Sequence, residues 1–246
     1  GAGDALTDAD YNTAIGAFAL TTDTLGSKSV AVGSSALFTQ NFTSATDTYN
    51  TAVGFNAGAL VTVGLRNTII GGLTGDALTD ADDNTAIGTQ ALSADTLGSG
   101  STAIGQGALG SQNFTGATTT YNTAVGHQAG VGISTGIQNS ILGANAGDAL
   151  TDADYNVAIG SFALTADTKG SKSIAIGHSA LGTQNLTSST DIYNVAIGHQ
   201  AGVAITTAGT NTIIGGLAGV TMTAAGSSNV ILGFQAGNVV TTPSNT

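Results

Sequence analysis

The sequence predicts an all-β fold, a parallel β-solenoid or β-roll of about thirteen coils. A five-residue motif, first seen at 12–16 as Asn-Thr-Ala-Ile-Gly, occurs thirteen times, and its last residue falls at 16, 33, 54, 71, 88, 105, 126, 143, 160, 177, 198, 215 and 233. Four coils make one super-repeat, since the sequence at 3–8 returns at 75–80 and 147–152. The motif is rich in Thr and β-branched residues, which favour strands. A fixed short period is typical of a solenoid, in which each unit buries its apolar face by stacking on its neighbours.

Each motif predicts one strand, with its second and fourth residues on one face and its third on the other. The fourth residue is always β-branched or Leu, as in Ile15, Val32 and Leu142, so we expect the second and fourth residues to fill the inside of the coil. The third residue is also apolar throughout, which indicates that its face is covered as well. A thin solenoid has nothing of its own to cover it, so we expect another copy of the chain there. The predicted oligomer interface is Ala14, Ala31, Ala52, Ile69, Ala86, Ala103, Ala124, Ile141, Ala158, Ala175, Ala196, Ile213 and Ile231.

The rest of each coil follows one plan. After the motif come two variable residues, then in most coils Ala, and then Leu or Gly; a variable stretch such as 21–28 returns the chain to the next motif. The short coil that this plan produces suits two short strands and two tight turns. The first residue of the motif is often Asn, and we expect Asn12, Asn50, Asn67, Asn84 and Asn122 to form an amide ladder at one corner of the coils.

Uniform periodicity along the whole chain argues for a single solenoid domain, 1–246. Its super-repeats are 3–74, 75–146 and 147–218, with a terminal partial repeat at 219–246. At about 4.8 Å per coil, we expect an elongated body on the order of 60 Å long. The sequence begins at Gly1 without Met, and Gly1-Ala2-Gly3 is similar to the end of a repeat such as 145–147. We interpret the chain as part of something longer.

Composition excludes several classes of partner. The chain has four Lys and Arg against fifteen acids, all of them Asp, and a net charge of −11. Nucleic acids and anionic membranes are bound through Lys and Arg, so neither is predicted as a partner. No apolar run approaches the roughly 20 residues that span a bilayer. The absence of Cys rules out a disulfide framework.

Three coils are longer than the others, because each carries a four-residue insertion, around 38–43, 110–115 and 182–187. Insertions in a solenoid lie along one edge as loops, often on a binding face. The insertions contain Phe, Gln and Asn, and aromatic rings and amides are side chains that commonly bind sugars. Alternatively, the rings of Phe42 and Phe114 fold back and cap their own coils. The candidate ligand-binding residues are Gln40, Asn41, Phe42, Gln112, Asn113, Phe114, Gln184 and Asn185.

A second candidate site is the acidic segment 7–12, Thr-Asp-Ala-Asp-Tyr-Asn, which has close counterparts at 79–84 and 151–156. Alternating oxygen ligands of this kind can bind Ca²⁺, but the Gly and distal Glu of an EF-hand are missing. Turn formation and solubility are the alternative. We predict no other cofactor. The weak metal candidates are Asp8, Asp10, Asp80, Asp82, Asp152 and Asp154.

Apart from these aspartates, neither the three histidines nor any other set of side chains predicts a catalytic or metal site. His127 and His199 occupy equivalent positions in successive super-repeats, about 19 Å apart along four coils, so they cannot share a metal. His178 is interpreted as isolated too, and each histidine as a surface or packing residue. No Ser–His–Asp set, Cys–His set or carboxylate pair stands out from the repeats. The sequence therefore predicts no enzyme.

The motif followed by two residues and Ala, as in Ser-Val-Ala-Val-Gly-Ser-Ser-Ala at 29–36, resembles the head repeats of trimeric autotransporter adhesins. It is equally similar to repeats of bacteriophage tail fibres, and the resemblance runs from about residue 12 to 237. It implies a left-handed parallel β-roll, three chains around one axis, and attachment to a surface. Both the short and the long coils of this chain exceed the repeats of adhesin heads in length.

Three functions remain open. The first is attachment of an extracellular, cell-surface or virion protein to a host glycan or envelope component. The second is a spacer or a filament subunit that stacks end to end, because solenoid ends expose unpaired strand edges. The third is ice binding, which requires a regular Thr array on a flat face; Val30, Val157, Ile174 and Val195 interrupt such an array.

Overall fold

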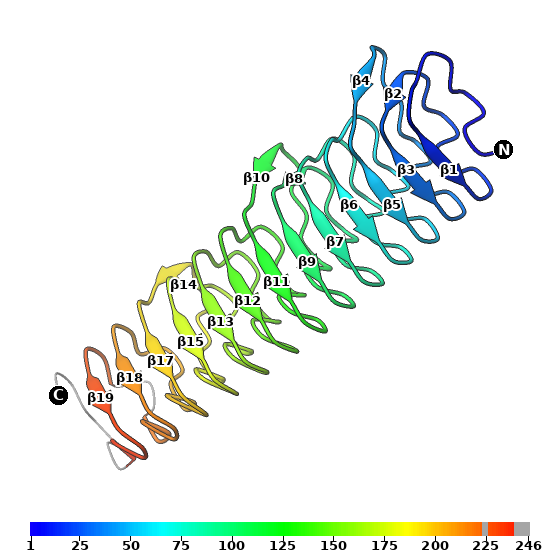
Figure 1. Cartoon of the computed structure of the whole chain (residues 1–246). Helices are drawn as coiled ribbons and strands as arrows, with labels where there is room; N and C mark the ends of the chain where they lie inside the picture. The colour runs from blue at the N-terminus through cyan, green and yellow to red at the C-terminus, as the bar shows by residue number, and fades with distance from the viewer. Residues whose placement is uncertain (223–225, 239–246) are drawn as a thin grey trace. The chain divides into compact units, whose positions relative to one another are not determined.

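The computed structural model describes residues 1–222 and 226–238 and shows a parallel β-solenoid of about thirteen coils, with no helix in that part of the chain. The predicted fold class is confirmed. The chain divides into two compact units, Gly1–Tyr121 and Asn122–Thr246, and each is a stack of coils (Figure 1). Of the predicted terminal repeat at 219–246, residues 223–225 and 239–246 lie outside the described residues.

In the first unit, every motif forms a three-residue strand of one parallel sheet. Thr13 lies opposite Val30, and Val30 lies opposite Thr51. The intervals between motifs in the sequence are therefore the steps from coil to coil. The strands are β1 (Thr13–Ile15), β3 (Val30–Val32), β5 (Thr51–Val53), β6 (Thr68–Ile70), β7 (Thr85–Ile87) and β9 (Thr102–Ile104).

The second unit repeats this arrangement, with Thr123 opposite Ser140 and Ile174 opposite Val195. Its strands are β11 (Thr123–Val125), β12 (Ser140–Leu142), β13 (Val157–Ile159), β15 (Ile174–Ile176), β17 (Val195–Ile197), β18 (Thr212–Ile214) and β19 (Val230–Leu232).

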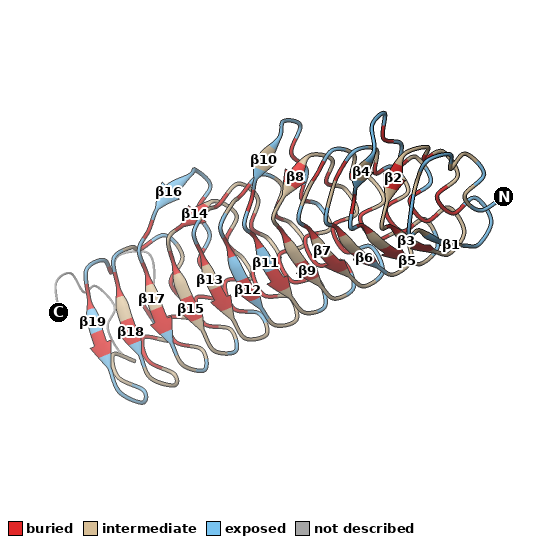
Figure 2. Cartoon of the chain, turned by 45° about the horizontal axis from the view of Figure 1, so that its top comes forward, coloured by how far each residue is buried: buried red, intermediate tan, exposed pale blue. Residues whose placement is uncertain are grey.

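The three long coils add short paired strands away from the main sheet. In the first unit β2 (Gly26–Ser27) pairs with β4 (Thr46–Asp47), and β8 (Gly98–Ser99) pairs with β10 (Thr118–Thr119). In the second, β14 (Gly170–Ser171) pairs with β16 (Thr190–Asp191). The inserted residues leave the coil as loops on one edge, where β4, β10 and β16 are drawn in Figure 2.

The prediction of which strand face lies inside is wrong. The third residue of the motif points into the coil, and all of these residues except the half-exposed Ala14 are buried within the single chain. They are covered already and cannot form the predicted contact with another copy. Figure 2 shows the buried middle residue on most strands. The corrected residues are Ala31, Ala52, Ile69, Ala86, Ala103, Ala124, Ile141, Ala158, Ala175, Ala196, Ile213 and Ile231.

The physical reason is the size of the coil interior. Most coils that carry Ala at the third position place a buried Leu after the motif, as Leu20 and Leu37 do. Coils that carry Ile there instead have Gly at the position of that Leu, and the Ile fills the space. A Cβ built on Gly147 would lie 3.0 Å from Cδ1 of Ile141. Because interiors are close-packed, each Ile occupies the volume that Leu fills in most coils with Ala. Three coils have a small residue at both positions, namely Ala and Gly, and each of them contains another fully buried aliphatic residue: Val61, Ile133 or Ile205.

The asparagine ladder is confirmed, with backbone groups as its main partners. Asn50 Oδ1 accepts a hydrogen bond from the backbone N–H of Asn67 at 2.9 Å, and Asn50 Nδ2 donates to the carbonyl of Gly64 at 2.7 Å. Asn67 Oδ1 accepts from the N–H of Asn84 in the same way at 3.0 Å. Each buried amide therefore ties the returning segment of its own coil to the next coil, which satisfies backbone groups that would otherwise be orphaned at the corner.

Candidate interaction surfaces

The outer face of the main sheet carries the second and fourth residues of each motif. In the first unit the fourth position forms a column of Val and Ile, of which Ile70 is 36% exposed. In the second unit the same column includes Leu142, which is 49% exposed. No charged residue occupies either position in any of the thirteen motifs. A parallel sheet is normally covered on both faces, and nothing in the described part of the chain covers this face.

Threonine shares that outer face. In the first unit the second position is Thr13, Thr51, Thr68, Thr85 and Thr102, interrupted by Val30. In the second unit the interruptions at Val157, Ile174 and Val195 lie on consecutive paired strands. The array that ice binding requires is therefore broken for three coils in a row.

Most of the predicted ligand-binding residues are inaccessible. Gln40, Gln112 and Gln184 are fully buried, and the rings of Phe42 and Phe114 are at most 7% exposed. The rings fold back onto their own coils, as the alternative interpretation has it. Asn41, Asn113 and Asn185 remain exposed, and their side-chain oxygens accept hydrogen bonds from Thr24, Thr96 and Thr168 at 3.2–3.3 Å.

The glutamines are committed to a buried carboxylate that the sequence analysis missed. Asp23 is fully buried and accepts hydrogen bonds from Gln40 Nε2 at 2.5 Å, from Gly26 N at 3.0 Å and from Phe42 N at 3.2 Å. Asp95 and Asp167 repeat this arrangement. These donors replace the water that each carboxylate loses on burial. The available signal was the segment Asp-Thr-x-Gly-Ser at 23–27, 95–99 and 167–171, always one coil before a Gln.

The same glutamine also continues the amide ladder. The motif that begins each long coil has Ser in place of the ladder Asn, and Gln40 Nε2 donates to Ser29 Oγ at 2.9 Å. Asn50 Nδ2 then donates to Gln40 Oε1, also at 2.9 Å. The short serine side chain leaves room for the inserted amide, so the insertion is anchored in the wall of the solenoid.

The accessible part of each insertion is its tip. Residues 43–45 and Asp47 are exposed in the first insertion, and residues 187–191 are exposed in the third. Lys28 donates to Asp47 at 2.5 Å, which raises the pKa of Lys28 and lowers the pKa of Asp47. Lys172 and Asp191 form the same pair at 2.6 Å. Exposed tyrosines flank both lysines, with Lys28 Nζ 5.2 Å from the ring centre of Tyr49, a cation–π distance.

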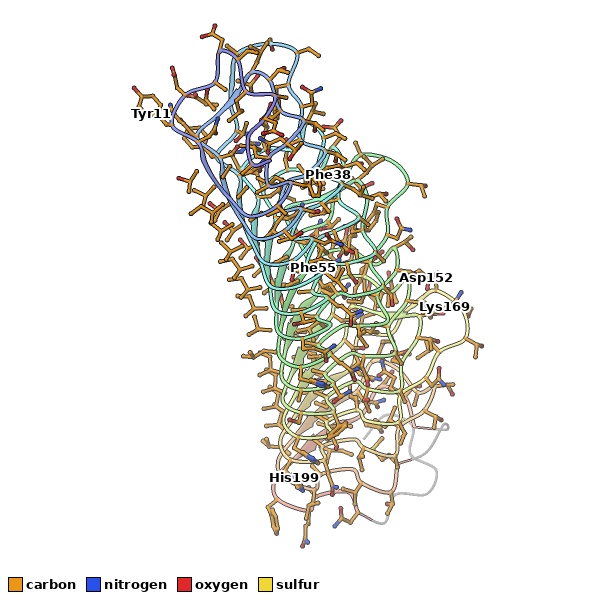
Figure 3. The ribbon with its side chains drawn as sticks, turned by 90° about the vertical axis from the view of Figure 1, so that its right-hand side faces the viewer. Tyr11, Phe38, Phe55, Asp152, Lys169 and His199 are labelled. Carbon is orange, nitrogen blue, oxygen red and sulfur yellow. The ribbon has the colours of Figure 1, made fainter. Side chains whose placement is uncertain are left out.

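The acidic segments have structural roles. Asp82 Oδ1 accepts from Leu65 N at 2.7 Å, and Asp154 Oδ1 accepts from Ile137 N at 2.8 Å. These bonds join neighbouring coils that are 17 residues apart, so the carboxylates bind the backbone of another coil and not that of their own turn. Asp152 lies 3.6 Å from Lys169 Nζ (Figure 3). Within residues 1–222 and 226–238, no group of three or more Asp, Glu, His or Cys side chains could hold a metal ion. Asp8, Asp10 and Asp80 lie exposed at the same turns.

The interpretation of His178 as isolated is wrong. Its ring stacks on that of His199, with centroids 5.3 Å apart and planes inclined by 24°. Phe162 contacts the other side of His178 edge-on, at 5.9 Å between centroids. Each histidine directly follows the glycine of its motif, and the two motifs are consecutive, so the coils bring them together.

No family model, curated protein or solved structure matches the chain. Among the described residues, no helix is present that could cross a membrane.

Proposed function

We propose that the chain is a non-enzymatic surface-attachment protein that works as a homo-oligomer outside the cell or on a virion. The observation that carries the proposal is the uncharged outer face of the main sheet, with its column of partly to fully exposed β-branched residues and Leu. The resemblance of the motif to adhesin heads and tail fibres supplies the number three and the attachment role.

A second copy of the chain is the occupant that best fits this face. Columns of side chains repeat at the coil spacing of about 4.8 Å, and an identical solenoid presents the same spacing. Side chains of one copy can therefore pack between those of another along many coils. Burying apolar surface contributes about 25 cal/mol per Å², and no charge on the face opposes it.

Attachment is assigned to the tips of the insertions. The strand residues are occupied by the core and by the proposed assembly, whereas the tips at 43–47, 115–119 and 187–191 include many exposed residues. Three tips per chain give nine in a homotrimer, so weak contacts with a glycan or an envelope component would sum through avidity.

The assembly is tested by charging the outer face. Ile87→Asp with Ile104→Asp should dissociate the oligomer, because paired apolar surfaces do not accept unpaired carboxylates. Both side chains point outward, so the monomer should stay folded by circular dichroism. Thr89→Asp is the control, since Thr89 is exposed but lies after the motif glycine. Sedimentation that shows a monomeric parent would exclude the assembly.

The attachment role is tested separately by replacing the three tips with Gly-Ser segments while Gln40, Gln112 and Gln184 are kept. Binding to host cells or envelope glycans should fall by at least tenfold, while the oligomer persists. The matched control replaces the exposed residues 89–90 in a short coil. Unchanged binding would exclude the tips as the attachment site.

A structural spacer or a self-stacking filament subunit is the second candidate. The observation that favours it is the burial of Gln40, Gln112 and Gln184, because the insertions then contribute to the solenoid wall itself. A parent oligomer that binds no cell or glycan, but forms filaments visible by electron microscopy, would favour this function.

A further inference from the structure

The stacked imidazoles of His178 and His199 form the one histidine pair of the described residues with close ring contact. Both side chains are exposed, and His199 is labelled in Figure 3. Neither histidine belongs to the sheet face or to the insertion tips on which the proposed function rests.

The backbone holds the two histidines on neighbouring coils. Gln200 N–H donates to the carbonyl of His178 at 2.8 Å, immediately beside the pair. The preceding strands β15 and β17 are paired from Ile174–Val195 to Ile176–Ile197. The two Cα atoms are therefore one coil apart, about 4.8 Å, and no backbone ordering is needed for both rings to bind one ligand.

The orientation of one ring is also defined. Nδ1 of His178 lies 3.1 Å from Oγ of Ser179, and Phe162 packs against the ring edge-on. A hydrogen bond at one imidazole nitrogen leaves the other available as a ligand and increases its basicity.

We propose that His178 and His199 together bind a divalent first-row transition-metal ion, of the class Cu²⁺, Ni²⁺ or Zn²⁺. Neutral imidazole is a preferred ligand of these ions, and affinity for nitrogen sites is greatest for Cu²⁺. A metal–nitrogen bond of about 2.0–2.1 Å to each ring requires the two ring nitrogens to converge on the ion from the stacked arrangement. Imidazole lone pairs lie in the ring plane, so one ring has to leave the stacked arrangement to bind the same ion. The His178 ring keeps its bond to Ser179, and the exposed ring of His199 rotates about χ1 and χ2 to bring its nitrogen to the ion. Two protein ligands leave the remaining coordination positions to water. The bound ion would link two neighbouring coils at the surface.

The test uses Cu²⁺ alone, titrated into the full chain at neutral pH and followed by calorimetry and electron paramagnetic resonance. We expect one ion per chain with two nitrogen ligands, and a higher melting temperature, because an ion that binds the folded state stabilises it. His178→Gln and His199→Gln should each lower the affinity by at least tenfold, since one imidazole cannot chelate. His127→Gln is the matched control: it removes the histidine equivalent to His199 and should change nothing.

Three results would overturn the proposal. One is a single-nitrogen copper signal in the parent chain, and another is an affinity that is unaffected in either single variant. The third is retention of the tight ion in the double variant, which would place it on the aspartates. Exposed substitutions should leave the circular dichroism spectrum unchanged, so loss of binding is not confused with loss of fold.

Discussion

Asp76 has a carboxylate oxygen without a hydrogen-bond partner in the described part of the chain, and desolvation raises the pKa of this half-buried group. Its counterpart one super-repeat later, Asp148, accepts a hydrogen bond from Thr165 at 2.5 Å. The residue equivalent to Thr165 in the coil after Asp76 is Ser93, whose hydroxyl lies 3.5 Å from the carbonyl of Gly110. Thr165 and Ser93 differ by one methyl group and in the direction of the hydroxyl, so the carboxylate of Asp148 has a hydrogen-bond donor that the carboxylate of Asp76 does not have.

Asp76→Asn should therefore stabilise the protein at pH 7. A raised folded-state pKa means that folding favours the protonated carboxyl of Asp76. The parent protein therefore has its full stability below the unfolded-state pKa of this group and loses stability as the pH rises through the folded-state pKa. Because water still screens this half-buried group, the advantage of the variant should be only about 0.5 kcal/mol at pH 7. It should vanish below pH 3.8, the ordinary pKa of the group. Chemical denaturation at both pH values measures it.

Asp80→Asn provides the comparison, because Asp80 is exposed in the same coil. It should change stability little at either pH. An Asp76→Asn variant that is less stable than the parent at pH 7 would show that the carboxylate has a partner the structure does not contain.

At the scale of the single element, the insertion coil depends on its buried carboxylate. In the third insertion, Asp167 accepts from Gln184 Nε2 at 2.5 Å and from Leu186 N at 3.1 Å. Gln184→Leu removes the side-chain donor and leaves a buried charge under-satisfied. We expect it to destabilise the protein by about 2–3 kcal/mol, measured by urea denaturation.

The double variant Gln184→Leu with Asp167→Asn distinguishes loss of the charge–amide bond from loss of packing. A neutral amide needs less compensation than a carboxylate, so the second substitution should recover part of the stability, and a double-mutant cycle gives the coupling. Strictly additive effects would contradict a direct interaction between the two side chains.

Strands and the amide corner were predictable from the sequence because both repeat at nearly every coil. The inside of the coil was not, because ranking by hydrophobicity favoured Ile70 and Leu142 over Ala52 as core. Volume gives a different answer: a coil with Ile at the third position, such as Ile69, has Gly at the position where most coils with Ala have Leu. That exchange was visible in the sequence, and only the structure shows that the two positions face each other across the interior.

The partners of Asp23 and His178 were harder to predict. The buried carboxylate and its glutamine lie on neighbouring coils, and nothing local indicates that the variable return segment points inward. The contact between the two histidines could have been predicted from the sequence, since each directly follows the glycine of a motif and the two motifs are consecutive. Comparison of His199 with His127, its equivalent four coils away, missed His178, which lies only one coil from His199.

At the scale of the whole molecule, charge and apolar surface are segregated. Lys28, Arg66 and Lys172 each directly precede the first residue of a motif and form ion pairs with aspartates. The outer face of the sheet has no charge in any motif. Excess negative charge keeps such a chain soluble, while the neutral face is free to pack against a copy without a desolvation penalty for ions.

The melting temperature should therefore depend on protein concentration. When copies associate only in the folded state, mass action stabilises that state, and the melting temperature rises as the concentration increases. We expect a rise of several degrees across a hundredfold range for the parent chain. The variant with Ile87→Asp and Ile104→Asp, which should be monomeric, should melt at one temperature throughout. Differential scanning calorimetry measures both, with Thr89→Asp expected to follow the parent. A parent transition independent of concentration would mean that the sheet face is exposed to water in the working protein, and the proposed assembly would then be wrong.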